Sequence, residues 1–229
     1  PPRSTLFPYT TLFRSKKALV GVGINLDSEH PDIAKDLFPL LLESGKNLYG
    51  YLSTEYVKDM GTPDRLNGVE RDIYTGKVEL LKKANSKRAL FLDRDGVINQ
   101  EVDHLSSVEK FELIPCVSEA IQRANQAGLL VVVITNQPVI ARGELSVPGL
   151  QEVHNKMDTL LGKDGAYIDR IYYCPHHPDK GFDGEVEALK IDCDCRKPNI
   201  GLFLLAADEL NISLKDSWMV GDKIGRAHV

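Results

Sequence analysis

Two aspartates separated by one residue stand where an apolar run ends. Ala89 to Asp93 has the pattern of a short buried strand, and Asp95 and Gly96 follow it closely. Parallel strands deliver side chains to the carboxyl edge of a sheet, where open α/β sheets bind ligands. Both carboxylates can therefore face one anionic, metal-bound ligand. A calcium loop would instead need a preceding helix and a glutamate at its twelfth position, where His104 stands.

Cysteine and histidine residues form a second group with metal-binding spacing. Cys174 and His176 are followed, after an acidic loop, by Cys193 and Cys195. Three thiols and one imidazole suit tetrahedral coordination with no open position, so we predict structural Zn²⁺. The metal would order a loop too polar to form a core of its own. Cys116 is distant in sequence, and we expect it to be a small buried residue.

The segments around these groups alternate between strand and helix patterns, which predicts a doubly wound, Rossmann-like α/β sheet carrying a zinc loop. The expected strands cover residues 89–93, 129–134, 168–174 and 217–223. The expected helices run from Pro115 to Gly128, from Ser146 through Leu161, and from Asn199 to Leu210. His154 lies beside the apolar stripe of the second helix, and we expect it at the surface or partly packed.

Residues 16–74 have the pattern of a separate, partial α/β segment, with strands at 18–24 and 48–52 around a helix at 31–42. The string from Asp59 to Pro63 then resembles the D-x-G-T-P signature near the end of the sugar-phosphate nucleotidyltransferase domain. In that family the residue matching Asp59 helps hold the catalytic metal. No glycine-rich nucleotide loop precedes it here, so we interpret the segment as an inactive C-terminal remnant. The alternative is a simple turn after a strand.

Composition and chain ends set further expectations. The hydrophobic share of 42% and the net charge of -5 indicate a globular chain that does not bind nucleic acids or membranes in general. Clustered cysteines without a disulfide pattern predict a cytoplasmic location. Residues 1–15 and 224–229 resemble translated sequencing adapters, and we expect neither to be native. The polar residues 75–87 predict a linker.

The D-x-D-G string at Asp93 resembles motif one of the haloacid dehalogenase (HAD) phosphatases. Thr135, at the end of the second strand, matches motif two, and Asp222, at the end of the last, matches motif four. The HAD-like domain would cover residues 88–223. Family members carry a second acid four residues after the first in motif four, but Arg226 stands there. We therefore expect a C-terminally truncated domain with little or no activity.

Two further strings narrow the resemblance. C-P-H-H-P at 174–178 and C-D-C-R-K-P at 193–198 resemble the zinc-containing HAD branch, which includes heptose bisphosphate and histidinol-phosphate phosphatases. The string I-A-R-G at 140–143 resembles the heptose group, whereas Pro138 and Val139 replace its usual Ser-Gly. A nucleotidyltransferase remnant upstream would belong to the same heptose pathway.

The resemblance implies Mg²⁺-dependent hydrolysis of a phosphomonoester through an aspartyl phosphate. Asp93 would be the nucleophile and Asp95 the general acid and base, while Thr135 and Lys197 would stabilise the phosphoryl oxygens. Asp93, Asp222 and the backbone carbonyl of Asp95 would hold Mg²⁺. A set of surrounding residues would contact a small phosphorylated sugar, namely Glu101, Val102, Asp103, His104, Asn136, Gln137, Arg142, Arg196 and Lys223.

Three other functions remain open from the sequence. The same chemistry could act on histidinol phosphate. A full-length fusion could act as a sugar-1-phosphate nucleotidyltransferase, with the fused domain as its partner. A zinc-organised interaction module without catalysis is the third, and loss of Mg²⁺-dependent phosphate release in an Asp93→Asn variant that retains zinc would exclude it.

Overall fold

The computed structural model describes residues 32–48, 55–102 and 104–222. The chain divides into two compact units, residues 1–53 and 54–229. In the first, a π-helical turn at Ile33–Leu37 continues as α2 at Phe38–Glu43, and Leu37 and Leu41 are buried together. This confirms the helix predicted there. The strand predicted at 18–24, most of that at 48–52, and both terminal segments lie outside the described residues.

The second unit begins with two helices, α3 at Pro63–Tyr74 and α4 at Lys77–Leu80. The Thr62 hydroxyl accepts a hydrogen bond from the Arg65 backbone N–H and caps α3. Asp59 accepts one from Gly61 N at 3.0 Å and forms an ion pair with Arg65. The remnant assignment of residues 16–74 stays a prediction, as does the linker at 75–87, which contains α4.

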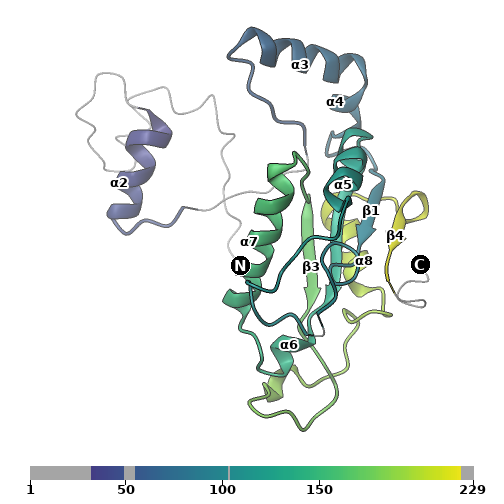
Figure 1. Ribbon diagram of the computed structural model, residues 1–229. Coiled ribbons are helices and arrows are strands. Elements are labelled where there is room, and N and C mark those ends of the chain that lie inside the picture. The colour runs from purple at the N-terminus through teal and green to yellow at the C-terminus, as the bar shows by residue number, and fades with distance from the viewer. Residues whose placement is uncertain (1–31, 49–54, 103, 223–229) are drawn as a thin grey trace. The chain divides into compact units, whose positions relative to one another are not determined.

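Four parallel strands form the sheet of this unit, in the order β3-β2-β1-β4 (Figure 1). Their bounds are Ala89–Leu92 for β1, Leu130–Asn136 for β2, Arg170–Cys174 for β3 and Trp218–Val220 for β4. Strand β1 pairs with β2 on one side and β4 on the other. Because all four run in one direction, their carboxyl ends meet at one edge, as the sequence predicts.

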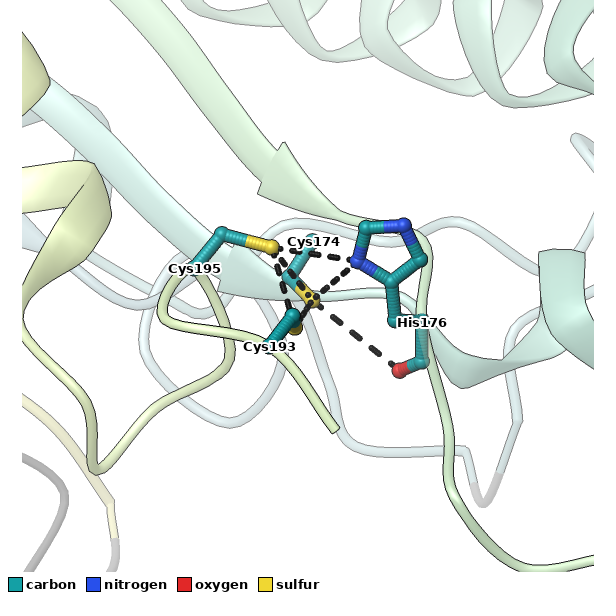
Figure 2. Close-up of side chains that lie close together, drawn as sticks. All are labelled: Cys174, His176, Cys193 and Cys195. Carbon is teal, nitrogen blue, oxygen red and sulfur yellow. Dashed lines mark hydrogen bonds between the residues drawn. The ribbon is translucent and has the colours of Figure 1, made fainter. Parts of the chain in front are cut away.

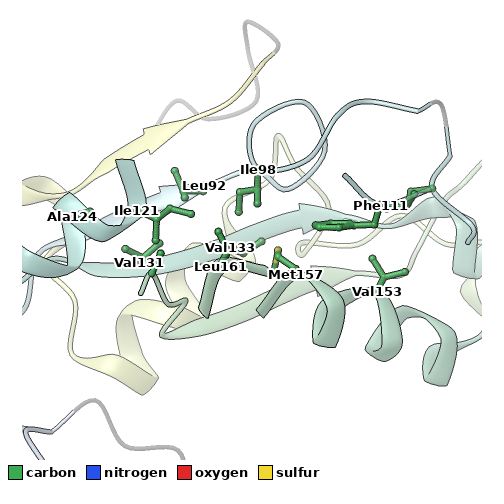
Figure 3. Packing of buried hydrophobic residues seen from close by; sticks show 12 residues of the cluster. Leu92, Ile98, Phe111, Ile121, Ala124, Val131, Val133, Val153, Met157 and Leu161 are labelled. Carbon is green, nitrogen blue, oxygen red and sulfur yellow. The ribbon is translucent and has the colours of Figure 1, made fainter. Parts of the chain in front are cut away.

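Helices cover both faces of the sheet. They are α5 at Val117–Gln126 and α7 at Val147–Lys163 on one face and α8 at Gly201–Leu210 on the other, whereas the short helix α6 at Pro138–Ala141 follows the carboxyl end of β2. Val131 and Val133 of β2 point into the core shared with α5 and α7 (Figure 3). Val132 and Ile134 point to the opposite core, with α8. Successive strand residues face opposite sides, so a strand covered on both faces has a continuous apolar sequence.

Three local predictions have different outcomes. The hydroxyl of Ser146 accepts a hydrogen bond from Gly149 N and caps α7, as predicted. Cys116 is exposed, which corrects the expected burial, and its positive φ of 67° delays the start of α5 to Val117. His154 was expected at the surface or partly packed, and at 4% exposed it is instead buried. No helix in the described ranges is long and apolar enough to cross a membrane.

Candidate active site and metal centre

Asp93 follows β1 directly and is buried beside a lysine. Its backbone N–H donates to the carbonyl of Val220 at 3.0 Å, which ties it to the end of β4. Lys197 Nζ lies 2.7 Å from Asp93 Oδ2 and donates to the carbonyl of Ile134 at 2.7 Å. The side chains of Asp93 and Lys197 are 2% and 0% exposed. A carboxylate at the sheet edge is thus paired with a cation from a segment that follows β3.

The turn after Asp93 brings a third acid to this place. Gly96 has a φ of +78°, and a Cβ added there would lie 2.8 Å from Asp222 Oδ2. The Asp222 carboxylate therefore packs directly on the turn that contains Asp95, as predicted for motifs one and four. Carboxylate and carbonyl oxygens are the hard ligands that Mg²⁺ prefers, so these residues fit that ion.

The Asp95 carboxylate is held by three side chains. Arg94 Nη2 lies 2.9 Å from both carboxylate oxygens, and Asn99 Nδ2 donates to Oδ1 at 3.0 Å. Gln137 Nε2 donates to Oδ2 at 2.9 Å. The prediction has Asp95 bind the metal through its backbone carbonyl only. The hydrogen bonds end on its side-chain oxygens, so they do not compete with that contact.

The residues at the end of β2 also lie in this site. The hydroxyl of Thr135 accepts a hydrogen bond from Gln137 Nε2 at 2.9 Å. Asn136 pairs with the backbone of Lys197 in both directions, at 2.9 Å and 3.0 Å. Asn136 and Gln137 were predicted to contact substrate, but these bonds commit much of their amides to holding Lys197, Asp95 and Thr135.

A pocket of about 380 Å³ opens at this edge. It is lined by acids, amides, a cation and an apolar wall, namely Asp93, Asp95, Glu101, His104, Leu105, Asn136, Gln137, Pro138, Val139 and Arg196. Sequence reasoning missed Leu105 as a lining residue, because an apolar residue in a loop carries no chemical signal. Val102 packs against the core instead of lining the pocket. Asp103 and Lys223 lie outside the described residues.

The four predicted zinc ligands converge at the carboxyl end of β3, whose last residue is Cys174, as Figure 2 shows. The three sulfur atoms lie 3.1 to 3.5 Å apart, and His176 Nδ1 is 3.2 Å from Cys195 Sγ and 3.8 Å from Cys174 Sγ. Tetrahedral zinc with bonds of about 2.3 Å places its ligand atoms roughly 3.5 to 3.8 Å apart. Burial raises the pKa of the Cys174 thiol. A bound cation would offset that cost, so these residues fit zinc.

Comparison with known proteins agrees with this geometry. A family model described as polynucleotide kinase 3 phosphatase matches residues 91–229. A D-glycero-beta-D-manno-heptose-1,7-bisphosphate 7-phosphatase of Escherichia coli O6:H1 (strain CFT073) is 43% identical over 141 residues, covering 62% of this chain and 72% of the relative. The chain belongs to the HAD phosphatase family. The Vibrio cholerae protein with the same name is 44% identical over 138 residues, covering 60% of this chain and 72% of the relative.

Two solved HAD structures show the same fold. A HAD-like phosphatase from Mesorhizobium loti has a TM-score of 0.57 and 38% identity, covering 62% of this chain and 66% of that one. A D,D-heptose 1,7-bisphosphate phosphatase from B. bronchiseptica, complexed with magnesium and phosphate, has a TM-score of 0.53 and 35% identity. It covers 61% of this chain and 72% of that one.

In this HAD phosphatase the zinc loop, residues 174–195, contacts Arg142 in the segment after motif two. Arg196 Nη1 donates to the carbonyl of His176 at 3.1 Å. The Arg142 guanidinium contacts His104, which lines the pocket, and lies 3.4 Å from His177 Nε2. Arg142 is not itself a lining residue. Burial, with Arg196 and Arg142 nearby, lowers the pKa of His177.

Phe182 organises this contact, and no sequence motif indicates it. The Arg142 guanidinium lies 4.4 Å from the centre of its ring, and Lys190 Nζ lies 4.6 Å away. The Lys190 side chain is 1% exposed and forms an ion pair with Glu185 at 3.3 Å. Cation–π attraction strengthens when the cation is shielded from water. Phe182 therefore links the zinc loop to Arg142.

Proposed function

We propose that this protein is a Mg²⁺-dependent phosphatase that removes the 7-phosphate of D-glycero-D-manno-heptose 1,7-bisphosphate. The observation that carries the proposal is the buried contact between Asp93 and Lys197 at the sheet edge, with Asp222 packed on the next turn and a polar pocket in front. The names of the relatives favour the heptose bisphosphate over histidinol phosphate.

The reaction divides into two displacements. A carboxylate oxygen of Asp93 attacks phosphorus, and the bond from phosphorus to the sugar oxygen breaks. Asp95 donates a proton to that oxygen as it leaves, then accepts one from the water that attacks the aspartyl phosphate. Inorganic phosphate departs and the Asp93 carboxylate is regenerated. When bound, Mg²⁺ screens the carboxylate from the phosphate that it approaches.

Cations around the pocket support recognition of a doubly phosphorylated sugar. In this proposal, Lys197 and the Thr135 hydroxyl stabilise charge on the transferred group. Arg196 lines the pocket, and Arg142 reaches it through His104. A substrate with a second phosphate gains from these cations, whereas one with an uncharged or cationic distal end does not.

The direct test is phosphate release from a panel that includes the heptose bisphosphate, a heptose monophosphate and histidinol phosphate. Because Arg226 stands where the family has the second acid of motif four, all rate measurements use the Arg226→Asp background as the reference protein. We expect this reference protein to prefer the bisphosphate in kcat/KM and Asp93→Asn to abolish release. The control is Asp208→Asn, an exposed aspartate on α8, which should leave the rate unchanged. An unchanged rate in Asp93→Asn would contradict the catalytic proposal, and a preference for histidinol phosphate would contradict the substrate proposal.

Two finer points belong to the same proposal. The close cluster of Cys174, Cys193 and Cys195 supports a reducing, cytoplasmic location, because neighbouring cysteines oxidise readily elsewhere. A nucleotidyltransferase fused upstream would act in the same pathway. Nucleotide binding by the protein, measured calorimetrically, would show that more than an inactive remnant is present.

A further inference from the structure

We propose that Arg94 and Gln137 are positioning residues that hold the Asp95 carboxylate in place for proton transfer. The inference rests on the proposed function, in which Asp95 is the general acid and base. It assigns a positioning role to the residue between the two motif-one aspartates and replaces the predicted substrate contact of Gln137 with a different role.

Arg94 grips the carboxylate from inside the protein. Its Nε donates to Asp95 Oδ1 at 3.1 Å, and its Nη2 lies 2.9 Å from both oxygens. The Arg94 side chain is 1% exposed, whereas that of Asp95 is 20% exposed and lines the pocket. A planar guanidinium fixes the plane of a carboxylate as well as its position. Arg94 therefore sets the direction in which Asp95 presents its oxygens.

Gln137 closes the arrangement from the end of β2. Its Nε2 donates to Asp95 Oδ2 and to Thr135 Oγ1, both at 2.9 Å, and its Oε1 accepts from Arg94 Nη2 at 2.9 Å. Both amide hydrogens and one lone pair are thus used, which fixes the amide orientation. The residue is 2% exposed. Gln137 couples the acid and base to the hydroxyl of motif two and keeps little capacity for a substrate.

His154 supports Arg94 from α7. Its Nε2 lies 3.5 Å from Arg94 Nη1, and its ring meets Tyr173 edge to face. Burial and the positive charge of Arg94 lower the pKa of His154 to about 4. The imidazole is therefore neutral near pH 7 and does not repel the guanidinium. This explains the burial of a histidine that the sequence analysis expects at the surface or only partly packed.

The reaction makes the orientation of Asp95 important. A proton must reach the sugar oxygen while its bond to phosphorus breaks, and a displacement of about 1 Å can cost 100-fold in rate. A good leaving group such as p-nitrophenolate departs without a proton. A variant that only misplaces Asp95 therefore slows the sugar phosphate and spares the nitrophenyl ester, whereas a general defect slows both.

The experiment compares kcat/KM on the heptose bisphosphate and on p-nitrophenyl phosphate for Gln137→Met, with Arg94→Lys as a second variant that retains the charge. We expect a loss of about 10- to 100-fold on the sugar phosphate and a loss below about threefold on the nitrophenyl ester, approaching the pattern of Asp95→Asn. Gln151→Met, an exposed glutamine on α7, is the matched control and should change neither rate.

Equal losses on both substrates, or no loss on the sugar phosphate, would overturn the inference. Should Gln137→Met fail to fold, as judged by circular dichroism, Arg94→Lys decides alone. The proposed function is judged separately by Asp93→Asn, which must lose both activities. If Asp95→Asn itself shows no dependence on the leaving group, the acid and base assignment fails, and the inference fails with it.

Discussion

Replacing Lys197 with methionine tests the central ion pair of the site. The substitution keeps the length of the side chain and removes its charge, which leaves the buried Asp93 carboxylate without its lysine. At the observed 2.7 Å, and with an effective dielectric constant of about 20, Coulomb attraction between the two charges is about 6 kcal/mol. Breaking a buried pair by removing one partner typically costs about 3 to 5 kcal/mol.

We expect Lys197→Met to lower the free energy of unfolding by about 3 kcal/mol when no Mg²⁺ is added. Urea denaturation with Lys215→Met as the control measures this, because Lys215 is exposed. Saturating Mg²⁺ should restore part of the loss, since a cation at Asp93 replaces the missing charge. Loss of a donor to the transferring phosphoryl group should also lower kcat about 100- to 1000-fold.

Two results would refute this reasoning. Identical urea midpoints for Lys197→Met and Lys215→Met would show that the pair contributes nothing to stability. A kcat within threefold of wild type, at full zinc content, would show that the lysine does not stabilise the transferring group.

Three other predictions follow from the zinc loop, its docking and the sheet. Cys195→Ser should lower zinc content below one equivalent, measured by mass spectrometry, and reduce kcat as Lys197 moves; unchanged activity without zinc would contradict the coupling. A Cβ at Gly143 would lie 2.0 Å from the carbonyl oxygen of Gly184, so Gly143→Ala should lower Tm by several degrees. The control is Gly162→Ala in α7, which has open space around it and should raise Tm slightly. Burial raises the pKa of Asp169 to about 6. The unfolded chain therefore ionises at lower pH than the folded one, and the free energy of unfolding falls as pH rises from 4 to 6. Asp169→Asn should remove this fall and gain about 2 to 3 kcal/mol of stability at pH 8, and parallel pH profiles of variant and wild type in urea denaturation would contradict this.

Residues at strand ends were the most predictable part of the site. Asp93, Thr135 and Asp222 each follow an apolar run, and parallel strands share one carboxyl edge, so their proximity follows from the order of the elements. The zinc ligands were predictable for a similar reason. Two closely spaced pairs of donors need only one loop closure to meet.

Contacts that depend on the path of a loop were not predictable. Phe182 and Lys190 have no motif, and their contact arises only because the zinc loop folds back on Arg142. His154 lies beside an apolar helical stripe, and the buried arginine that it contacts comes from another part of the chain. Helical periodicity identifies a face but not the polar partner on the facing element.

Strand β4 has a consequence for how the protein is made. It is the last strand of the sheet in the sequence, yet it pairs with β1, which is the first. The hydrogen bond from Ala89 N to Ser217 Oγ joins residues 128 positions apart. A ribosome synthesises Asp93 long before Asp222, so a nascent chain can pack β1 and β2 while the turn with Asp93 and Asp95 still lacks the Asp222 carboxylate. Such a chain would acquire its thiol-bound ion first and its hydrolytic competence last, so newly made protein remains inactive toward cellular phosphate esters until the last of these strands has been made.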